Sequence, residues 1–534
     1  MTLTRRIWHI GHVMVIVLLL LSTRIVYWQL FRGQTLQPVV LDPSTAAAQY
    51  QTLGGGSVIP AGPATFDDLP QPVVQRTRVF LAGIKRGTIF DQAGRPLAYD
   101  YEEADGTKAR FYAEPSLAHV TGYVSGLRTG VTGIERTFNV SLLGLNRIDT
   151  QINQMLYQPI VGSDVYLTID SRTQRAAAEA LGDRAGAVVA LDAETGAVLA
   201  MVSRPGFDPN QVQNVQYVTN LLANCGTDAN CQSAFVNRAA QGLFVPGSTW
   251  KTVTLVAALD SGLAQPDTMF DVGPPLQDGQ GQYYAYWVDG GKVIDRNHPE
   301  AVLNLQRAYV TSANAVFAQL GDELGGETLI NYAQRLGFGR GEPPPLEIET
   351  SAARLANDPD ALERNNLLRA VTAIGQGELL ASPLSVALMV TAVVNEGDMP
   401  EPHLLASVRH PSGAVLRKEP QAIWSKNIMA PETARQVRQM MIALVDRGSP
   451  AAVPGLTVGG KTGTAEVGDN KAPHAWFAGF AANETRTVAI AVIVENGGQG
   501  SSVAAPIFAR VADAALNHYG EPVEEVVPPP VARE

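Results

Sequence analysis

Three short motifs, set far apart and in a fixed order, constrain this 534-residue chain more than any other feature. They are Ser248-Thr249-Trp250-Lys251, Ser312-Ala313-Asn314 and Lys461-Thr462-Gly463. Only one serine in the chain, Ser248, is followed three positions later by a lysine, and Lys-Thr-Gly occurs once. Ser-x-Asn also occurs at 425–427, but the order and spacing of the set favour Ser312. Motifs this far apart act together only if the fold gathers distant segments at one site.

The first motif has the residue types that nucleophilic catalysis needs. A serine hydroxyl is a weak nucleophile until a base takes its proton. Pro246 and Gly247 break the chain and predict a helix that begins at Ser248. Residues three apart lie on one face of a helix, so the Lys251 amine can reach the serine. Because an amine that is desolvated near other cations has a lowered pKa, we predict that Ser248 is the nucleophile and Lys251 its base.

The second and third motifs predict contacts with a substrate. On a turn that opens a helix, the Ser312 hydroxyl can relay a proton and the Asn314 amide can hold a substrate carbonyl. An N-cap is the alternative role for this motif, and the two roles are compatible. Lys461 follows two glycines in a predicted strand, beside which a substrate backbone can lie as an added strand. Its charge and the Thr462 hydroxyl suit a substrate carboxylate.

An oxyanion hole is also expected at this site. The first N–H groups of a helix have no partner inside the helix and stabilise developing negative charge. We therefore predict that the backbone amides of Ser248 and Thr464 form the oxyanion hole. Thr462, Gly463 and Thr464 are predicted to bind the substrate.

Composition and cysteine usage argue against other kinds of site. The net charge is −11 without a dense basic block, so nucleic acid is not expected as a partner. Cys225 and Cys231 flank a turn-rich stretch and could close a small disulfide loop outside the cell, with two free thiols as the alternative. No third or fourth soft ligand is near them, so no metal site and no cofactor are predicted. We expect His298 and His474 to be packing or surface residues.

The N-terminus predicts a membrane anchor. The stretch from Ile7 to Thr23 is apolar apart from two histidines, with Arg5 and Arg6 before it and Arg24 after it. It is at the short end for a bilayer span. A cleaved signal peptide is the alternative, but no small-x-small cleavage site follows. We expect a single-pass protein of the plasma membrane with a cytoplasmic N-terminus and an extracytoplasmic remainder.

Four regions follow from the pattern of the chain. Residues 1–32 form the cytoplasmic start and the anchor. Residues 33–160 form a linker and a small, mostly extended domain, with strand–turn–strand at 86–98 and a strand-like stretch at 118–144. A large domain is expected over 161–520, and residues 521–534 look disordered.

The large domain is predicted to be α+β, with strands at both ends and a helical middle. A helix that Asp170 and Ser171 can cap runs to Leu181. The region 242–397 is expected to be largely helical. The predicted strands lie at 165–169, 187–191, 197–202, 456–464, 475–481 and 487–495.

These motifs resemble those of class B penicillin-binding proteins. The stretch 161–515 is similar to their transpeptidase domain, and 78–145 is similar to their pedestal, a small dimerisation-like domain. The best match in the class is the PbpA-like subgroup, and residues 54–72 have no counterpart. The stretches that carry the resemblance are Arg86-Gly87-Thr88-Ile89-Phe90-Asp91, Phe244-Val245-Pro246-Gly247 before the first motif, Gly375-Gln376-Gly377, Thr464-Ala465-Glu466 and Pro473-His474-Ala475-Trp476-Phe477.

The resemblance implies a fold and an activity. The fold is the penicillin-binding transpeptidase fold, a central antiparallel sheet with a helical subdomain. Ser248 would attack the D-Ala-D-Ala amide of a peptidoglycan stem peptide, form an acyl-enzyme and pass the acyl group to a neighbouring amine. β-Lactam antibiotics would acylate the same serine. A SEDS-type membrane glycosyltransferase is the implied partner, through the anchor and the pedestal.

Three alternatives remain open at this point. A D,D-carboxypeptidase differs only in using water as the acceptor. A β-lactamase of class A needs a glutamate with an asparagine four places on, which Glu363 does not have, and class D carries Ser-x-Val as its second motif. The third alternative is not an enzyme: a membrane scaffold that activates a polymerase and performs no catalysis itself.

Overall fold

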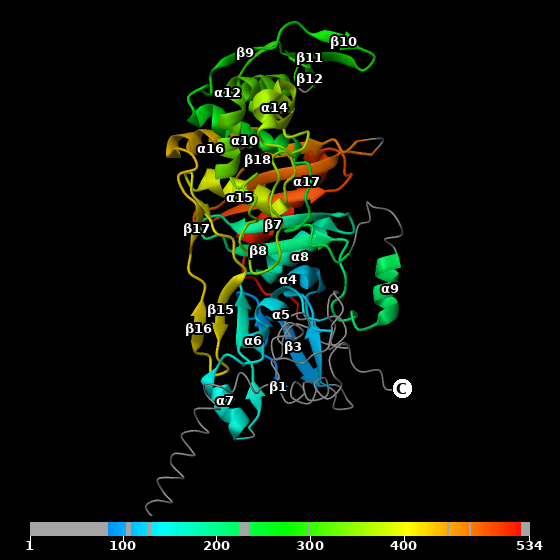
Figure 1. The fold of residues 1–534 in the computed structure, drawn as a ribbon, viewed down its shortest axis with the longest axis vertical. Helices are drawn as coiled ribbons and strands as arrows, with labels where there is room; N and C mark the ends of the chain where they lie inside the picture. Colours follow the sequence, from blue (N-terminus) through cyan, green and yellow to red (C-terminus); the bar gives the residue numbers. More distant parts are fainter. Residues whose placement is uncertain are drawn as a thin grey trace, which may run out of the picture.

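The two largest sheets lie one above the other along the long axis of the molecule, which is vertical in Figure 1. The computed structural model describes residues 84–524, except 103–107, 126–129, 157, 224–233, 297, 299, 446–447 and 469–470. The predicted anchor, residues 33–83, Cys225 and Cys231 lie outside the described residues. Within the described part, no helix has the length and apolar character needed to cross a membrane.

The upper sheet has five antiparallel strands, which confirms the predicted central sheet. Its order is β18 (Thr457–Ala465), β19 (His474–Ala482), β20 (Thr487–Val494), β7 (Gly186–Asp192) and β8 (Val198–Arg204). Successive side chains of a strand point to opposite faces. In β20 the larger residues Val488, Ile490 and Val492 face one layer of helices, and Ala489 and Ala491 face the other.

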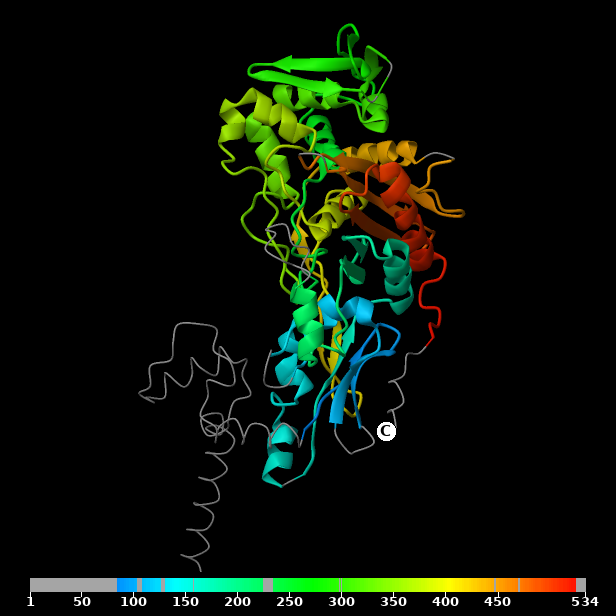
Figure 2. The ribbon, with the colours of Figure 1, turned by 90° about the vertical axis from the view of Figure 1, so that its right-hand side faces the viewer.

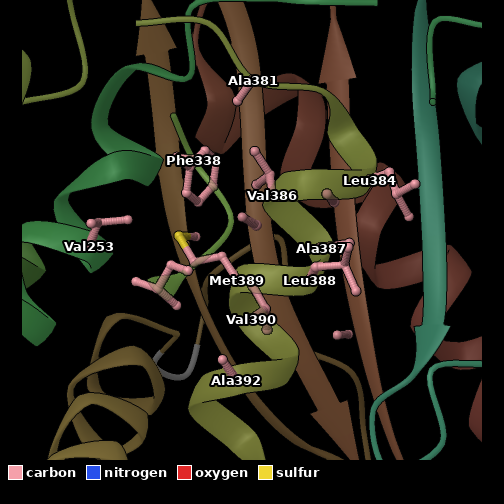
Figure 3. Packing of buried hydrophobic residues seen from close by; sticks show 14 of the residues in the cluster. Val253, Phe338, Ala381, Leu384, Val386, Ala387, Leu388, Met389, Val390 and Ala392 are labelled. Carbon is pink, nitrogen blue, oxygen red and sulfur yellow. The ribbon is translucent and has the colours of Figure 1, made fainter. Parts of the chain in front are cut away.

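Helices cover both faces of this sheet. Two of them, α8 (Ser171–Leu181) and α17 (Gly500–Leu516), pack on the face with the larger residues. As predicted, Asp170 caps α8, since its carboxylate accepts from the Thr173 amide. The opposite face receives α15 (Pro383–Val394), which is buried along almost its whole length. Figure 3 shows Leu384, Leu388 and Met389 of this helix packed into the core beside the strands.

A helical subdomain lies above the sheet. The turn η4 (Gly247–Trp250) leads into α10 (Lys251–Asp260), which packs beside α12 (Asn314–Arg335), and α14 (Asn366–Ala373) packs against α12. Other helices of the large domain are α11 (Leu305–Thr311), α13 (Ala361–Arg364) and α16 (Pro431–Leu444), and α9 (Val215–Ala223) lies lower down. The subdomain confirms the predicted helical middle of the large domain.

Strands interrupt that helical region, where none was predicted. The outermost part of the molecule in Figure 1 is a three-stranded sheet of β10 (Leu276–Asp278), β11 (Gly281–Val288) and β12 (Gly291–Asp295). In the same region, β9 (Met269–Asp271) pairs with β13 (Val302–Asn304). The physical reason is local, because the aromatic run of β11 has high β propensity and lies between glycine-containing turns.

The lower sheet combines strands from both halves of the chain. Its order is β16 (Val415–Lys418), β15 (Leu405–Arg409), β6 (Asp164–Leu167), β2 (Ile89–Phe90), β3 (Pro96–Glu102) and β4 (Lys108–Tyr112). The sheet therefore crosses the predicted boundary between 160 and 161, since β6, β15 and β16 come from the large domain. Sequence periodicity does not reveal which distant strands pair. The short strands elsewhere are β1 (Ile84–Lys85) with β5 (Ile160–Val161), and β14 (Met399–Pro400) with β17 (Ile423–Ser425).

Short helices flank the lower sheet, and the strand-like prediction for 118–144 was wrong. Ile134, Phe138 and Leu142 recur every four residues and are all buried, which is helical periodicity. The helical turns and helices of this region are η3 (Pro115–Leu117), α4 (Ala118–Thr121), α5 (Gly133–Thr137), α6 (Asn139–Leu142) and α7 (Ile148–Met155).

A buried ion-pair network joins this region to the lower sheet. Glu135 of α5 has no exposed surface and binds Arg86 at 2.6 Å and Arg110 at 2.7 Å. Arg110 also pairs with Asp100 at 3.0 Å. The two guanidinium groups keep the pKa of the Glu135 carboxyl below its usual value although burial alone would raise it. Arg86, which belongs to one of the stretches quoted for the resemblance, is thus a structural residue beside the lower sheet.

The chain after α17 returns to the lower sheet (Figure 2). Arg95 donates to the Glu521 carbonyl at 2.7 Å, and Arg175 donates to the Glu524 carbonyl at 2.7 Å. The first four residues of the segment predicted to be disordered are therefore tied to the folded body. The remainder, 525–534, lies outside the described residues.

Candidate active site

The three motifs meet in one cleft between the upper sheet and the helical subdomain. The cleft has a volume of about 1100 Å³. Ser248, Ser312, Asn314, Thr462 and Thr464 line it, together with residues of β12 and of the turn at 376–377. The fold thus gathers the predicted segments, and the remaining motif residues lie just behind the cleft wall.

The first motif is positioned by two glycine contacts. Gly247 has a φ of 55°, in the left-handed region that favours glycine, and its amide donates to the Gly375 carbonyl at 3.0 Å. A Cβ at Gly375 would lie 1.9 Å from the Gly247 carbonyl oxygen, so only glycine fits there. Ser248 is the second residue of η4, which continues into α10. The predicted helix start is therefore confirmed, with a 3₁₀ first turn.

Lys251 connects the first motif to the second. Its side chain is fully buried, and Nζ donates to the Ser312 carbonyl at 2.7 Å, to Ser312 Oγ at 3.1 Å and to Asn314 Oδ1 at 2.6 Å. These three acceptors use all three donors of an ammonium group. Within the described residues, Lys251 makes no hydrogen bond to Ser248. Lys251 can accept the proton of Ser248 only after it has lost one of its own three protons.

The pKa of Lys251 fits such a proton exchange. Burial lowers it from its ordinary value of 10.5 to about 7, although the nearby Asp295 carboxylate raises it in part. Burial also lowers the pKa of Lys461 well below its ordinary value, and the charge on Lys251 lowers it further. Two buried ammonium groups close together repel each other, so the site favours the loss of a proton.

The environment of Lys461 differs from the prediction that it would present a charge to a substrate carboxylate. The side chain is fully buried, Nζ donates to the Thr462 carbonyl at 3.2 Å, and Lys461 does not line the cleft. Side chains alternate along β18, so Lys461 and Gly463 face η4, and Thr462 and Thr464 face the cleft. Of the third motif and the residue after it, only the two threonines reach the cleft.

The third motif packs closely against the first. A Cβ at Gly463 would lie 2.8 Å from the Cβ of Trp476 and 3.0 Å from the Pro246 carbonyl oxygen. The Trp476 indole donates to the Val245 carbonyl at 3.0 Å. Since β18 is an edge strand of the upper sheet, one side of it is open to an added strand, as the glycine pattern suggested.

The predicted oxyanion donors lie on neighbouring segments. A Cβ at Gly247 would lie 3.0 Å from the Thr464 carbonyl oxygen, which brings the backbone before Ser248 against that of Thr464. This close approach is what two amides directed at one oxygen require. Their role as an oxyanion hole stays a prediction.

The second motif has an unusual backbone. Ser312 ends α11 in the left-handed conformation, with φ 60° and ψ 40°, and Ala313 is the residue before α12. The N-cap alternative for Ser312 was therefore wrong. A non-glycine residue in this region is strained unless its surroundings hold it. Here Lys251 binds both oxygens of Ser312.

Sequence reasoning missed a buried carboxylate beside the second motif. Asp295 ends β12, has no exposed surface and accepts a hydrogen bond from the Ala315 amide at 2.8 Å. A single aspartate in an unrecognised strand gave no signal for it. Gln376, Gln499 and Ser501 also line the cleft, and only Gln376 was part of a quoted stretch.

The two histidines singled out in the sequence are packed against neighbouring groups. His298 is buried and hydrogen-bonded within its own turn, and His474 packs against the ring of Phe244. Among the residues that the structure describes, no group of three or more His, Cys, Asp and Glu side chains could hold a metal ion.

Known proteins share both the sequence and the fold. The family model for the penicillin binding protein transpeptidase domain matches residues 186–513. The peptidoglycan D,D-transpeptidase PbpA of Mycobacterium tuberculosis H37Rv is 32% identical over 437 residues, which cover 77% of this chain and 85% of that protein. PbpA of Mycolicibacterium smegmatis is 32% identical over 460 residues, which cover 81% of this chain and 89% of that protein.

Solved structures agree with these relatives. The ceftriaxone acyl-enzyme complex of M. tuberculosis penicillin-binding protein A is similar, with a TM-score of 0.72 at 30% identity, over 82% of this chain and 99% of that chain. From its motifs, its fold and these similarities, the chain belongs to the penicillin-binding protein transpeptidase family and to the PbpA-like group of its class B.

Proposed function

We propose that this protein is a peptidoglycan D,D-transpeptidase. Neutral Lys251 accepts the proton of Ser248 while Ser248 Oγ attacks the carbonyl of the D-Ala-D-Ala amide of a stem peptide. The amide bond breaks, the proton passes to the departing D-Ala amine, and an acyl-serine remains. The amine of a second stem peptide then attacks the ester, gives up a proton and restores the serine, which leaves a cross-link.

One observation carries this proposal. Lys251, with its pKa lowered to about 7, is bonded to the second motif in the wall of the cleft that Ser248 lines. An acyl transfer needs a nucleophile, a base that is neutral at working pH, and donors near the oxyanion. Ser248 and Lys251 meet at one cleft, the amides of Ser248 and Thr464 would supply the donors, and a β-lactam can acylate the same serine by the same steps.

The acceptor of the acyl group distinguishes a transpeptidase from the nearest alternative activity. A D,D-carboxypeptidase would use the same acyl-serine but give it to water. The similarity to named transpeptidases favours an amine acceptor. A β-lactamase and a scaffold without catalysis are less well supported, since the first lacks the expected glutamate pattern and the second leaves an intact site unused.

We further propose that the protein acts at the outer face of the plasma membrane. The apolar stretch from Ile7 to Thr23 would anchor it, with the N-terminus in the cytoplasm. A SEDS-type glycosyltransferase would supply glycan strands and contact the anchor and the pedestal. Cross-linking and polymerisation would then occur side by side.

The test uses the full-length protein in detergent micelles with a labelled penicillin. We expect a stable covalent adduct on Ser248 by mass spectrometry, and none in Ser248→Ala. A stem peptide that ends in D-Ala-D-Ala, given with an amine acceptor, should yield D-Ala and a cross-linked product. Release of D-Ala without product would favour the carboxypeptidase, and rapid turnover of penicillin would favour the lactamase. A folded protein that gives neither adduct nor hydrolysis would favour the scaffold.

A further inference from the structure

Asp295 and His298 lie outside the three motifs, and Asp295 contacts the residue that directly follows the second motif. Asp295 Oδ2 accepts hydrogen bonds from the Ala315 amide at 2.8 Å and from His298 Nε2 at 3.0 Å. One residue earlier, the Ile294 carbonyl accepts a hydrogen bond from the Asn314 side chain at 3.3 Å. The end of β12 thus holds the first two residues of α12, which it meets above the upper sheet (Figure 1).

The surroundings of His298 favour its charged form. Its Nδ1 lies 2.7 Å from the Glu300 carbonyl, which can only accept, and its Nε2 faces the Asp295 carboxylate. Both ring nitrogens are therefore donors, and that is the imidazolium form. The ring stacks on Tyr284 with centroids 4.8 Å apart, and the pKa of His298 is raised. The imidazolium therefore partly offsets the negative charge of Asp295, whose Oδ2 also accepts from the Ala315 amide.

An ionised Asp295 acts on two features of the catalytic site. It is a negative charge at the N-terminus of α12, where the helix dipole favours one. It also raises the pKa of Lys251, against the effect of burial. The other groups near Lys251 are Ser312, Asn314, the Phe317 ring of α12 and Lys461 of β18, whose own pKa the charge on Lys251 lowers.

We propose that Asp295 and His298 are positioning residues for the reaction of Ser248. The pair fixes the start of α12, so that Asn314 and Ser312 stay in place around Lys251, and it sets the electrostatic field in which Lys251 releases and regains its proton. The inference rests on the proposed function, because it assigns to Lys251 the role of base.

The test compares the pH dependence of acylation in three variants of the full-length protein. Asp295→Asn keeps an acceptor for the Ala315 amide but removes the negative charge. His298→Gln removes the positive charge and leaves Asp295 uncompensated. Asp278→Asn is the matched control. It removes a carboxylate from the same three-stranded sheet, and this carboxylate pairs with Arg296 and not with α12. The second-order rate of acylation by a fluorescent penicillin is measured from pH 5 to 9.

The two variants should move the midpoint of the acidic limb in opposite directions. Without Asp295 the midpoint should fall by about 0.5–1 pH unit, because Lys251 loses a stabilising charge. Without His298 it should rise, because Asp295 then acts undiminished on Lys251. Asp278→Asn should keep the wild-type midpoint. A purely structural defect would lower the rate in both variants without opposite shifts.

Unchanged midpoints, or shifts in one direction, would overturn the inference while leaving the acylation of Ser248, and so the proposed function, intact. A wild-type protein that no penicillin acylates would instead overturn the proposed function. Thermal melting checks that each variant folds. Each direction is predicted separately, so either variant decides the question if the other does not fold.

Discussion

At the scale of single residues, the pair of buried lysines determines what the cleft can do. Lys251 and Lys461 have no exposed surface, and both have lowered pKa values. The charged form of a buried amine is disfavoured, so near neutral pH the pair holds fewer protons than two free lysines would. A base is then available without an additional carboxylate or histidine in the cleft.

The first prediction concerns the pH dependence of acylation in the wild-type protein. The neutral form of Lys251 decreases as pH falls through about 7. The acylation rate of Ser248 should therefore fall about tenfold per pH unit below that value and level off above it. The measurement is the rate of labelling by a fluorescent penicillin from pH 5 to 9. A rate that is flat between pH 5.5 and 8 would show that another group is the base.

A companion variant tests the identity of the base. Arginine cannot give up its proton in this range, so Lys251→Arg should lower the acylation rate by about 10²–10⁴-fold at every pH. Labelling in the same assay measures the loss, and thermal melting separates it from unfolding. Near-normal labelling by this variant would exclude Lys251 as the base.

At the scale of elements, close backbone contacts hold η4 in place. The turn at Gly375 approaches Gly247 so closely that a side chain cannot fit between them. The open edge of β18 then lies beside the nucleophile. The position of Ser248 therefore depends on a turn more than a hundred residues later in the chain.

The second prediction compares two glycines of that turn. Gly375→Ala and Gly377→Ala both place alanine at a positive φ, which costs about 1–2 kcal/mol in each case. Only the first also drives a Cβ into the Gly247 carbonyl; at Gly377 the nearest side-chain atom would be 3.4 Å away. Gly375→Ala should lower acylation about 100-fold, since a shift of about 1 Å has that effect. Equal losses in the two variants would show that strain alone matters.

The third prediction concerns the buried ion pairs of α5. Glu135→Gln leaves Arg86 and Arg110 without their shared carboxylate and should destabilise the protein by about 3–5 kcal/mol. Glu349→Gln is the control, because its pair with Arg136 is exposed and should contribute less than about 1 kcal/mol. Urea denaturation followed by circular dichroism measures both. Similar midpoints for the two variants would contradict the assigned role of Glu135.

At the scale of the whole molecule, the two sheets are not independent. The lower sheet takes β15 and β16 from a hairpin of the large domain, and the chain after α17 is bonded to Arg95 and Arg175. The pedestal is consequently built from three separated parts of the sequence. Its orientation relative to the cleft is fixed by these shared strands.

The fourth prediction follows from that construction. A fragment of residues 84–163 contains β2, β3 and β4 but lacks β6, β15 and β16, which leaves the inner edge of β2 unpaired. We expect the fragment to be largely unfolded by circular dichroism and nuclear magnetic resonance, because short unpaired strands are unstable in water. A cooperative unfolding transition of this fragment would instead show that the pedestal is an autonomous domain.

The sequence by itself determined the local features of this protein. Short apolar runs were enough to predict β7, β8, β19 and β20, and alternation was enough to predict β6, because both patterns are properties of neighbouring residues. The cap at Asp170 and the three motifs are local for the same reason. Where local patterns were weaker or misread, as in α5 and in β10 to β12, the predictions were wrong.

Only the tertiary structure decided what depends on residues far apart in the chain. The lowered pKa of Lys251, the burial of Lys461 and the contact of Asp295 with α12 arise from packing between distant segments. The same holds for the pairing of β6 with β15. Burial and electrostatic fields are set by everything that surrounds a group, so the motifs name the reacting residues and the fold gives them their chemistry.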